Sequence, residues 1–218
     1  MPACPLVTVL LPVWNGASLP LTAGGEEPLR VAIRSLARQE PAPDAPVPSF
    51  EVLAVDDGST DGTAALLDVL AAEHPCLRVL HRPHEGLPGA LNAGLAAARG
   101  ALVARMDADD VCHPQRLALQ AAWMAAHPGT GLLATRVHFG GDRETARGFA
   151  HFVDWQNGLL DHEAISRNRF RDTPVSHPSV MFRRELPRLH GGYADGFFAE
   201  DWELWLRWLH AGVRMAKL

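Results

Sequence analysis

The chain has 218 residues, of which 47% are hydrophobic and 21% charged, and its formal net charge at pH 7 is -5. This balance is typical of a globular protein of one full-sized domain, and it excludes a disordered chain, a collagen-like repeat and a disulfide scaffold. The negative charge argues against broad nucleic-acid binding, which needs clustered positive charge. Cys4, Cys76 and Cys112 are too few and too scattered for a disulfide framework or a zinc cage, and they suit a reducing cytosol.

Neither a membrane span nor a secretion signal is predicted. The longest apolar runs, such as residues 7–11, reach strand length and fall far short of the roughly 20 residues that a membrane helix needs. The N-terminus has no basic region followed by an apolar stretch. We therefore predict a cytoplasmic protein whose contact with the inner face of the cell membrane is at most peripheral.

Short apolar runs alternate with helical patterns along the first half of the chain. We predict strands at 7–11, 50–55, 77–80 and 101–106, and helices at 29–38, 63–73, 90–99 (with Gly100 as C-cap) and 114–127. Such alternation is typical of an α/β domain with a central, mostly parallel sheet flanked by helices. The proline-dense segment 41–48 is predicted to be a loop.

The second half is less regular. It contains two predicted strands, 132–139 and 179–183, and a final helix that begins near Glu200, with Trp202, Trp205, Leu206 and Leu209 on one face. The segment 140–172 carries many arginines and little periodicity, so no element is predicted there.

Three polar clusters each follow a predicted strand directly. Trp14 and Asn15 follow the first strand, Asp56 and Asp57 the second, and residues 107–110 the fourth. Because the carboxyl ends of parallel strands meet at one edge of a sheet, where ligands bind, we expect the three clusters to lie together.

The motif Asp107-Ala108-Asp109 is the clearest candidate site. Two carboxylates one residue apart, followed by Asp110, suit a hard divalent cation that takes its other ligands from water and substrate phosphates. The alternative is a cap for the helix beginning near Pro114, but capping needs one aspartate rather than three. We favour the metal site.

The other clusters leave alternatives open. Asp56 and Asp57 can form a turn and cap the next helix, or accept hydrogen bonds from a base or ribose. A tryptophan in the position of Trp14 is more often a core residue than a platform for a base. Glu200 and Asp201 can simply begin a helix, or form a partly desolvated site in which one carboxylate acts as a base.

Established phosphate-binding and hydrolase motifs are missing. The chain has no G-x-x-x-x-G-K-[ST] or G-x-G-x-x-G motif, so a bound phosphate would depend on a metal and on the backbone amides at Gly86. It also has no H-E-x-x-H and no G-x-S-x-G motif, which removes support for zinc enzymes and serine hydrolases.

Six motifs in order resemble the signature series of family 2 glycosyltransferases with the GT-A fold. They are PVWNG (12–16), DDGSTDGT (56–63), GLPGALNAG (86–94), RMDADD (105–110), SHPSVMFRR (176–184) and EDWELWLR (200–207). Each motif is modest alone, but six in sequence across nearly the whole chain are specific. The resemblance implies a hexosyltransferase-like enzyme that moves a sugar, with inversion, from a nucleotide diphosphate donor to an acceptor hydroxyl in bacterial polysaccharide or glycoconjugate synthesis.

The resemblance also implies roles for individual residues. Asp201 would be the base that deprotonates the acceptor, and Asp109, with Asp107, would bind Mn²⁺ or Mg²⁺. His177 and Glu200 would lie near the acceptor or the diphosphate. The donor, expected to be a UDP-sugar, would be bound by residues of the first four motifs, namely Pro12, Trp14, Asn15, Asp57, Gly86, Asn92, Asp107 and Ala108.

The same resemblance divides one domain, 1–218, into a nucleotide-binding half (1–110) and an acceptor-binding half (111–218). Many members of that family continue beyond the last motif with another strand and helix, so a truncated enzyme is one interpretation. The acceptor is expected to be a sugar or a lipid-linked molecule. Arginines of 140–172 could meet its phosphate, although a solvated basic surface is slightly favoured; they are Arg143, Arg167, Arg169 and Arg171.

Two other functions fit parts of the pattern. A nucleotidyltransferase uses a similar sheet and metal-bound phosphates, but it usually has a lysine in a glycine-bearing loop after the first strand, and no lysine stands there. A non-catalytic module that binds nucleotide sugars is the second alternative. Release of free nucleotide diphosphate would separate an enzyme from a binding module.

Overall fold

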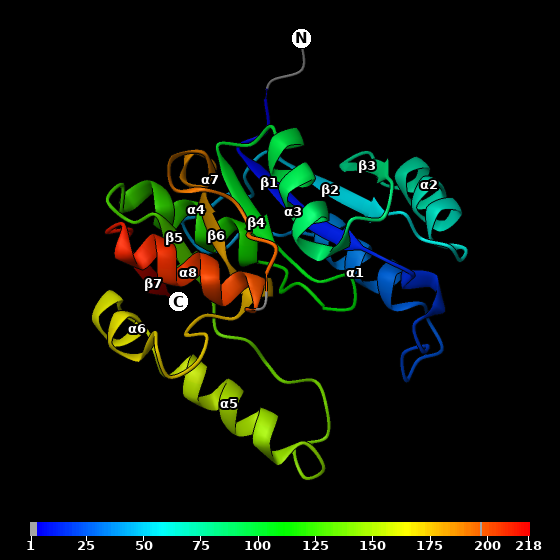
Figure 1. Cartoon of the computed structure of the whole chain (residues 1–218). Coiled ribbons are helices and arrows are strands. Elements are labelled where there is room, and N and C mark those ends of the chain that lie inside the picture. The colour runs from blue at the N-terminus through cyan, green and yellow to red at the C-terminus, as the bar shows by residue number, and fades with distance from the viewer. Residues whose placement is uncertain (1–3, 197) are drawn as a thin grey trace.

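A seven-stranded sheet forms the centre of the computed structural model, which describes residues 4–196 and 198–218 (Figure 1). Its strand order is β3-β2-β1-β4-β6-β5-β7. The strands are β1 (Val7–Val13), β2 (Phe50–Asp57), β3 (Leu77–Arg82), β4 (Leu102–Arg105), β5 (Leu132–Ala134), β6 (Met181–Arg183) and β7 (Met215–Lys217). The predicted α/β fold is confirmed.

The four N-terminal strands run parallel, so their carboxyl ends share one edge. β1 lies between β2 and β4, with Val13 opposite Asp56 and Leu10 opposite Arg105. β6 is antiparallel to β4 and β5, whereas β7 is parallel to β5. The register alone therefore brings the ends of β1, β2 and β4 side by side.

Helices cover both faces of the sheet. They are α1 (Pro28–Ala37), α2 (Thr63–Glu73), α3 (Gly86–Ala97), α4 (Arg116–Ala126), α5 (Arg147–Asn157), α6 (His162–Asn168), α7 (Glu185–His190) and α8 (Glu200–His210). Alternate residues of β1 enter opposite cores, because successive side chains of a strand point to opposite faces. Val9 packs with α1, α2 and α4, whereas Leu10 packs with α3 and α8. None of the helices that the structure describes has the length and apolar character of a membrane span.

Several predicted boundaries in the first half are wrong. β1, β2 and β3 extend to Val13, Asp57 and Arg82, and α4 begins at Arg116, after Pro114. The glycine-bearing segment before residue 90 is not a loop, because α3 already begins at Gly86. The Asp57 carboxylate accepts hydrogen bonds from the amides of Glu85 and Gly86, which satisfies donors at the helix start.

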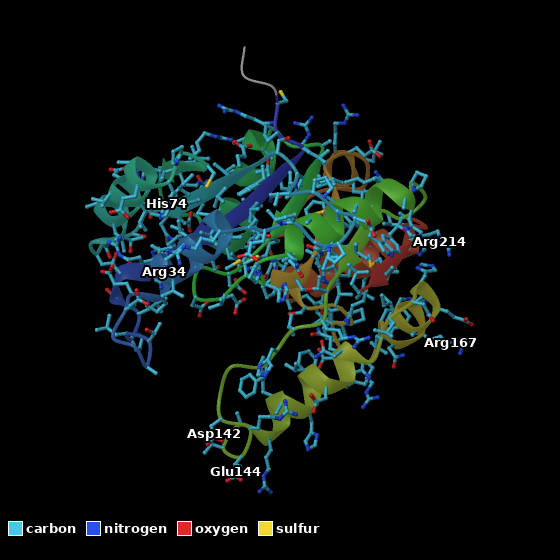
Figure 2. The ribbon with its side chains drawn as sticks, turned by 180° about the vertical axis from the view of Figure 1, so that it is seen from behind. Arg34, His74, Asp142, Glu144, Arg167 and Arg214 are labelled. Atoms are coloured by element: carbon cyan, nitrogen blue, oxygen red, sulfur yellow. The ribbon has the colours of Figure 1, made fainter. Side chains whose placement is uncertain are left out.

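The second half departs further from the predictions. The predicted strand 132–139 ends at Ala134, and segment 140–172 holds α5 and α6, which the sequence did not predict. α5 and the loop before it form an arm that extends from the body, with Asp142 and Glu144 at its tip (Figures 1 and 2). Its aromatic residues pack largely on one another, as in the edge-on pair Phe139–Phe149. Ala150, Val153 and Gln156 are nevertheless buried along one face of α5, a helical pattern that the prediction missed because Gln156 is polar and Phe149 is exposed.

α8 buries a different face from the predicted one. Leu204, Trp205 and Trp208 are fully buried, whereas Trp202 is half-buried. The indole of Trp202 instead donates a hydrogen bond of 2.7 Å to the carbonyl of Arg169. Trp202 therefore connects α8 to the segment that follows α6.

Gly100 has a packing role rather than the predicted capping role. α3 ends at Ala97, and a Cβ on Gly100 would lie 2.4 Å from the backbone nitrogen of Thr8 and 2.8 Å from the carbonyl oxygen of Leu102. Because backbone atoms cannot move aside, we expect Gly100→Ala to lower the free energy of unfolding by about 1–3 kcal/mol. Urea denaturation measures this loss.

Gly148→Ala is the matched control for this prediction. Gly148 lies within α5, and a Cβ placed on it would meet no atom within 4 Å. Alanine should therefore stabilise the helix by about 0.5–1 kcal/mol. If Gly100→Ala leaves the urea midpoint unchanged, the backbone around residue 100 can move to accept a Cβ without loss of stability, and the prediction is wrong.

Candidate active site

The structure brings the three polar clusters to one edge of the sheet. Asn15, just after β1, connects them: its backbone is left-handed with φ 50°. Its amide donates a 2.9 Å hydrogen bond to the Ser59 hydroxyl, and its side-chain oxygen accepts one of 2.8 Å from the Thr60 amide. Asparagine tolerates this conformation better than most residues, so Asn15 fixes the loop after β1 against the loop after β2.

Asp56 and Asp57 build the edge rather than project from it. Asp57 is 2% exposed and caps α3 through the amides described above, so the Gly86 amide is already engaged by a carboxylate. Burial raises the pKa of Asp56, but hydrogen bonds from Ser59 and His81 outweigh burial and leave the pKa below its usual value. The turn-forming alternative therefore describes Asp56, whereas Asp57 caps α3 rather than the next helix, and donor binding by Asp57 stays a prediction.

Trp14 is not a core residue. Its side chain is 56% exposed and stacks on the His84 imidazole, with ring centroids 4.8 Å apart and an interplanar angle of 21°. His84 Nδ1 lies 2.8 Å from the Asp57 carboxylate. The backbone of His84 packs against Gly58, where φ is +66° and a Cβ would lie 2.5 Å from the His84 nitrogen.

Sequence reasoning missed His84. It belongs to none of the six motifs, and only the neighbouring Gly58, in a turn that needs a glycine, hinted at a close approach. The result is an exposed pair of stacked rings beside the acidic edge. Flat aromatic faces of this kind can stack on a base.

The three aspartates after β4 differ in their surroundings. Asp107 is partly exposed, and its Oδ1 lies 2.6 Å from Nη1 of Arg105. Asp109 is exposed, and no hydrogen bond or ion pair joins its side chain to another residue that the structure describes. Asp110 also reaches the surface, yet burial of its carboxyl group, with the charges of Asp107 and Asp109 adding, raises its pKa to about 6.

These residues fit a divalent cation that is completed by a ligand. Among residues 4–196 and 198–218 no group of three or more acidic, histidine or cysteine side chains is assembled into a metal cage. Mg²⁺ and Mn²⁺ in phosphate-binding sites commonly use only one or two carboxylates, with substrate phosphates and water as the other ligands. The open carboxylate of Asp109 meets that requirement.

A second acidic group lies at the start of α8. Burial raises the pKa of Asp201, with the charge of Glu200 among the further causes. The Thr173 hydroxyl lies 3.4 Å from Oδ2 of Asp201, at the long end for a hydrogen bond. Asp201 is thus a partly desolvated carboxylate without a cationic partner among the described residues, as a general base requires.

His177 holds the other acid of the pair. Its Nδ1 lies 3.5 Å from Oε1 of Glu200, and its Nε2 lies 2.9 Å from the Tyr193 hydroxyl. Burial, with the charge of Arg105 next, lowers the pKa of His177, so the imidazole is neutral at pH 7. Because a carboxylate only accepts, we assign the proton to Nδ1, and Nε2 then accepts from Tyr193.

Asn92 supports this group from α3. Its side-chain amide donates a 2.8 Å hydrogen bond to the Tyr193 carbonyl and accepts one of 2.9 Å from the Tyr193 amide. The amide groups of Asn92 and Gly86 are therefore both used within the fold, Pro12 is buried in β1, and Ala108 packs partly on the core. Donor binding by these four residues stays a prediction.

The two acidic groups belong to one region. Asp107, Glu200, Asp201 and Arg105 all act on the pKa of His177 through their charges or hydrogen bonds. His177 itself begins the short segment that leads to β6, the neighbour of β4. Cavities of about 610 Å³ and 220 Å³ lie elsewhere, and neither is lined by Asp107, Asp109 or Asp201.

Known proteins share the sequence pattern of this chain. The family model described as "Glycosyl transferase family 2" matches residues 8–187. The amylovoran biosynthesis glycosyltransferase AmsE of Erwinia amylovora is 30% identical over 174 residues, which cover 77% of this chain and 61% of AmsE. The UDP-Gal:alpha-D-GlcNAc-diphosphoundecaprenol beta-1,3-galactosyltransferase of Escherichia coli is 30% identical over 188 residues, covering 84% of this chain and 63% of the relative.

A solved structure supports the fold. The mannosyltransferase PcManGT of Pyrobaculum calidifontis, in complex with GDP-Man and Mn²⁺, superposes with a TM-score of 0.71 at 24% identity, covering 100% of this chain and 55% of PcManGT. The chain thus spans between one half and two thirds of the length of these three proteins. Because the family model covers most of the chain, from β1 into α7, the chain belongs to glycosyltransferase family 2.

Proposed function

We propose that the chain transfers a sugar from a nucleotide diphosphate donor to an acceptor hydroxyl, with inversion at the anomeric carbon. One observation carries the proposal: Asp107, in the acidic motif after β4, and the desolvated Asp201 at the start of α8 both lie close enough to His177 for their charges to act on it. Single displacement needs these two elements, namely stabilisation of the leaving group and a base for the acceptor.

The acids after β4 would serve the leaving group. Asp109 would hold Mn²⁺ or Mg²⁺ directly, with Asp107 beside it. A bound cation supplies Lewis-acid stabilisation of the negative charge that grows on the departing diphosphate. The Mn²⁺ in the PcManGT complex supports this assignment by analogy of fold.

Asp201 would serve the acceptor. Its carboxylate takes the proton of the acceptor hydroxyl while the hydroxyl oxygen attacks the anomeric carbon, and the bond to the diphosphate breaks on the opposite face. Glu200 is engaged with His177, which leaves Asp201 as the carboxylate available for the proton. A raised pKa makes the ionised Asp201 carboxylate a stronger base.

The division of labour follows the two halves of the chain. Residues 1–110 would bind the nucleotide and the cation, and residues 111–218 the acceptor. The name of the Escherichia coli relative specifies a UDP-sugar donor and a diphosphoundecaprenol-linked acceptor. We accordingly expect a UDP-sugar and a sugar or lipid-linked acceptor, used at the cytoplasmic face of a bacterial membrane, in the synthesis of a polysaccharide or glycoconjugate.

A donor screen followed by a turnover assay tests the proposed function. Thermal shifts measured with UDP-sugars and GDP-sugars, with and without Mn²⁺, should show stabilisation by one nucleotide class, because ligands of the native state stabilise it by mass action. Free nucleoside diphosphate should then appear when a lipid-linked sugar acceptor is added. Neither the family match nor the relatives named above favour a nucleotidyltransferase.

The alternatives predict different products. Pyrophosphate formed from a nucleoside triphosphate would identify a nucleotidyltransferase. Tight binding of a nucleotide sugar, with no nucleoside diphosphate released by any acceptor tried, would identify a binding module.

The stacked rings of Trp14 and His84 provide a direct test of where the base binds. A base on the indole should contribute about 1–3 kcal/mol, so Trp14→Ala should raise the Kd of UDP by about tenfold. His84→Ala removes only the ring that supports the indole and should raise Kd by about threefold. Calorimetric titration with UDP and Mn²⁺ measures both changes.

His127→Ala is the matched control. His127 stacks on Trp123 in the same way, with centroids 3.8 Å apart and an interplanar angle of 16°, but at the end of α4, the helix that starts near the acids and leads away from them. Its replacement should leave the Kd of UDP unchanged. If His127→Ala and His84→Ala weaken UDP equally, the Trp14 stack is not the base platform.

A further inference from the structure

A buried guanidinium lies directly behind the acidic motif. Arg105 ends β4 and is 2% exposed. Val103, two residues earlier on the same face of the strand, belongs to the core under α3 and α8, so the Arg105 side chain points to that side of the sheet. Its Nε and Nη1 have no hydrogen-bond partner among the described residues. An arginine in such surroundings needs a counter-charge.

Asp107 supplies that counter-charge. Nη1 of Arg105 lies 2.6 Å from Oδ1 of Asp107, so the two side chains form a close ion pair. A buried charge left without its partner costs far more than an exposed one. We therefore expect the ion pair between Asp107 and Arg105 to persist in the folded protein.

Asp109 has the opposite environment. Its side chain is exposed and has no ion-pair partner in residues 4–196 or 198–218. A cation on Oδ1 of Asp107 would also touch the guanidinium, which repels it, whereas a cation on Asp109 avoids that contact. Asp107 and Asp109 therefore differ in their availability to a cation even in the free protein.

We propose that Arg105 is a positioning residue that neutralises Asp107 through the buried ion pair, so that Asp109 rather than Asp107 carries the divalent cation. This inference rests on the proposed function and refines it. A cation held by one protein carboxylate binds the free chain weakly, and it gains its other ligands from the diphosphate. Cation and donor therefore bind together, and the chain without donor holds little metal.

A charge cycle at Arg105 and Asp107 tests the proposal with Mn²⁺ alone. Binding is measured by the loss of the free Mn²⁺ signal in electron paramagnetic resonance, without nucleotide. Removing the positive charge in Arg105→Gln should tighten Mn²⁺ binding by about tenfold, and Asp107→Asn, which leaves the guanidinium unopposed, should weaken it by a similar factor. In the double variant Arg105→Gln/Asp107→Asn, the Kd of Mn²⁺ should return to within about threefold of the wild-type value. The ion pair has no net charge, and two uncharged side chains replace it.

The double variant decides the question. If Asp107 is itself a ligand, the double variant binds Mn²⁺ no better than Asp107→Asn, and the proposal is overturned. Arg105→Gln that binds no tighter than the wild type overturns it as well. Arg105→Lys keeps the charge and should keep the weak binding of the wild type, which a purely structural role for the guanidinium shape would not predict.

Two features keep the test decisive. Circular dichroism identifies any variant that fails to fold, and if Arg105→Gln does so, the comparison of Asp107→Asn with the double variant still gives the answer. The cycle contains no nucleotide, so its result is separate from the donor screen. A chain that binds no nucleotide sugar refutes the proposed function, whereas the Mn²⁺ cycle refutes or supports the role of Arg105.

Discussion

Asp201→Asn should lower kcat by about 10²–10⁴-fold while the Kd of the donor changes by less than about twofold. Asparagine has nearly the same shape as aspartate but cannot accept the acceptor's proton, so the loss appears in the transition state, where it corresponds to about 3–5 kcal/mol. Asp201 belongs to α8, whereas the stacked rings and Asp109 follow the parallel strands. Single-turnover rates and calorimetric titration with the donor separate the two effects.

Glu203→Gln is the control for this variant. Glu203 lies in the same first turn of α8 and pairs with Arg207 at 2.6 Å, so its replacement removes an equal charge from the helix start without touching the site. It should leave kcat near the wild-type value. An equal loss of donor affinity in Asp201→Asn would contradict the role of a base.

The pH profile gives an independent check on Asp201. Burial raises its pKa above the ordinary aspartate value of 3.8, and only the ionised carboxylate accepts a proton. Wild-type kcat should therefore rise as the pH increases through that raised pKa and fall below it. The residual activity of Asp201→Asn should lack this acidic limb.

The arrangement of the strand tips could be predicted from the sequence because it depends on connectivity. Alternating strands and helices require parallel strands, and parallel strands bring their carboxyl ends to one edge. Trp14, Asp57 and Asp107 lie at that edge for this reason. The placement of these residues follows from the order of strands and helices and does not depend on the residue types.

The role of each side chain at the edge could not be predicted in the same way. Asp57 and Asp109 are both aspartates after a strand, yet Asp57 is buried under the start of α3 and Asp109 is exposed. What separates them is tertiary contact, namely the Glu85 and Gly86 amides that lie against Asp57. The ion pair between Asp107 and Arg105 also depends on tertiary packing. Both residues belong to one motif, but only the folded structure buries the guanidinium away from water.

The second half resisted prediction for a different reason. α5 stands out from the body, so its aromatic residues contact one another and the residues after α6, as when the Arg171 guanidinium lies 5.0 Å from the Trp155 ring centre. Hydrophobic periodicity reports packing of one helix face on a large core. α5 does bury one face, through Ala150, Val153 and Gln156, but the polar Gln156 and the exposed Phe149 run against a simple apolar pattern. Short elements such as β7 give almost no periodic signal.

Asp109→Ala should abolish the Mn²⁺-dependent part of nucleoside diphosphate binding. Asp109 is exposed and has no side-chain partner among the described residues, so its loss removes the protein ligand that the cation would use. Of the two acids that remain, Asp107 is opposed by Arg105, and Asp110 has a pKa raised to about 6. The Kd of UDP measured with Mn²⁺ should rise by at least about tenfold, to the value found without metal. Calorimetric titrations with Mn²⁺ and with EDTA provide the two values.

The matched control removes an acid far from the site. Glu144 lies at the tip of the α5 arm, and its side chain has no ion-pair partner among the described residues (Figure 2). Glu144→Ala changes the net charge by the same amount as Asp109→Ala, so a general charge effect would weaken UDP binding in both variants. An Asp109→Ala variant that still binds UDP more tightly with Mn²⁺ than with EDTA would place the cation on another ligand, with the exposed Asp110 as the first alternative. Under the proposed function, the metal dependence of the reaction would rest on the exposed side chain of Asp109.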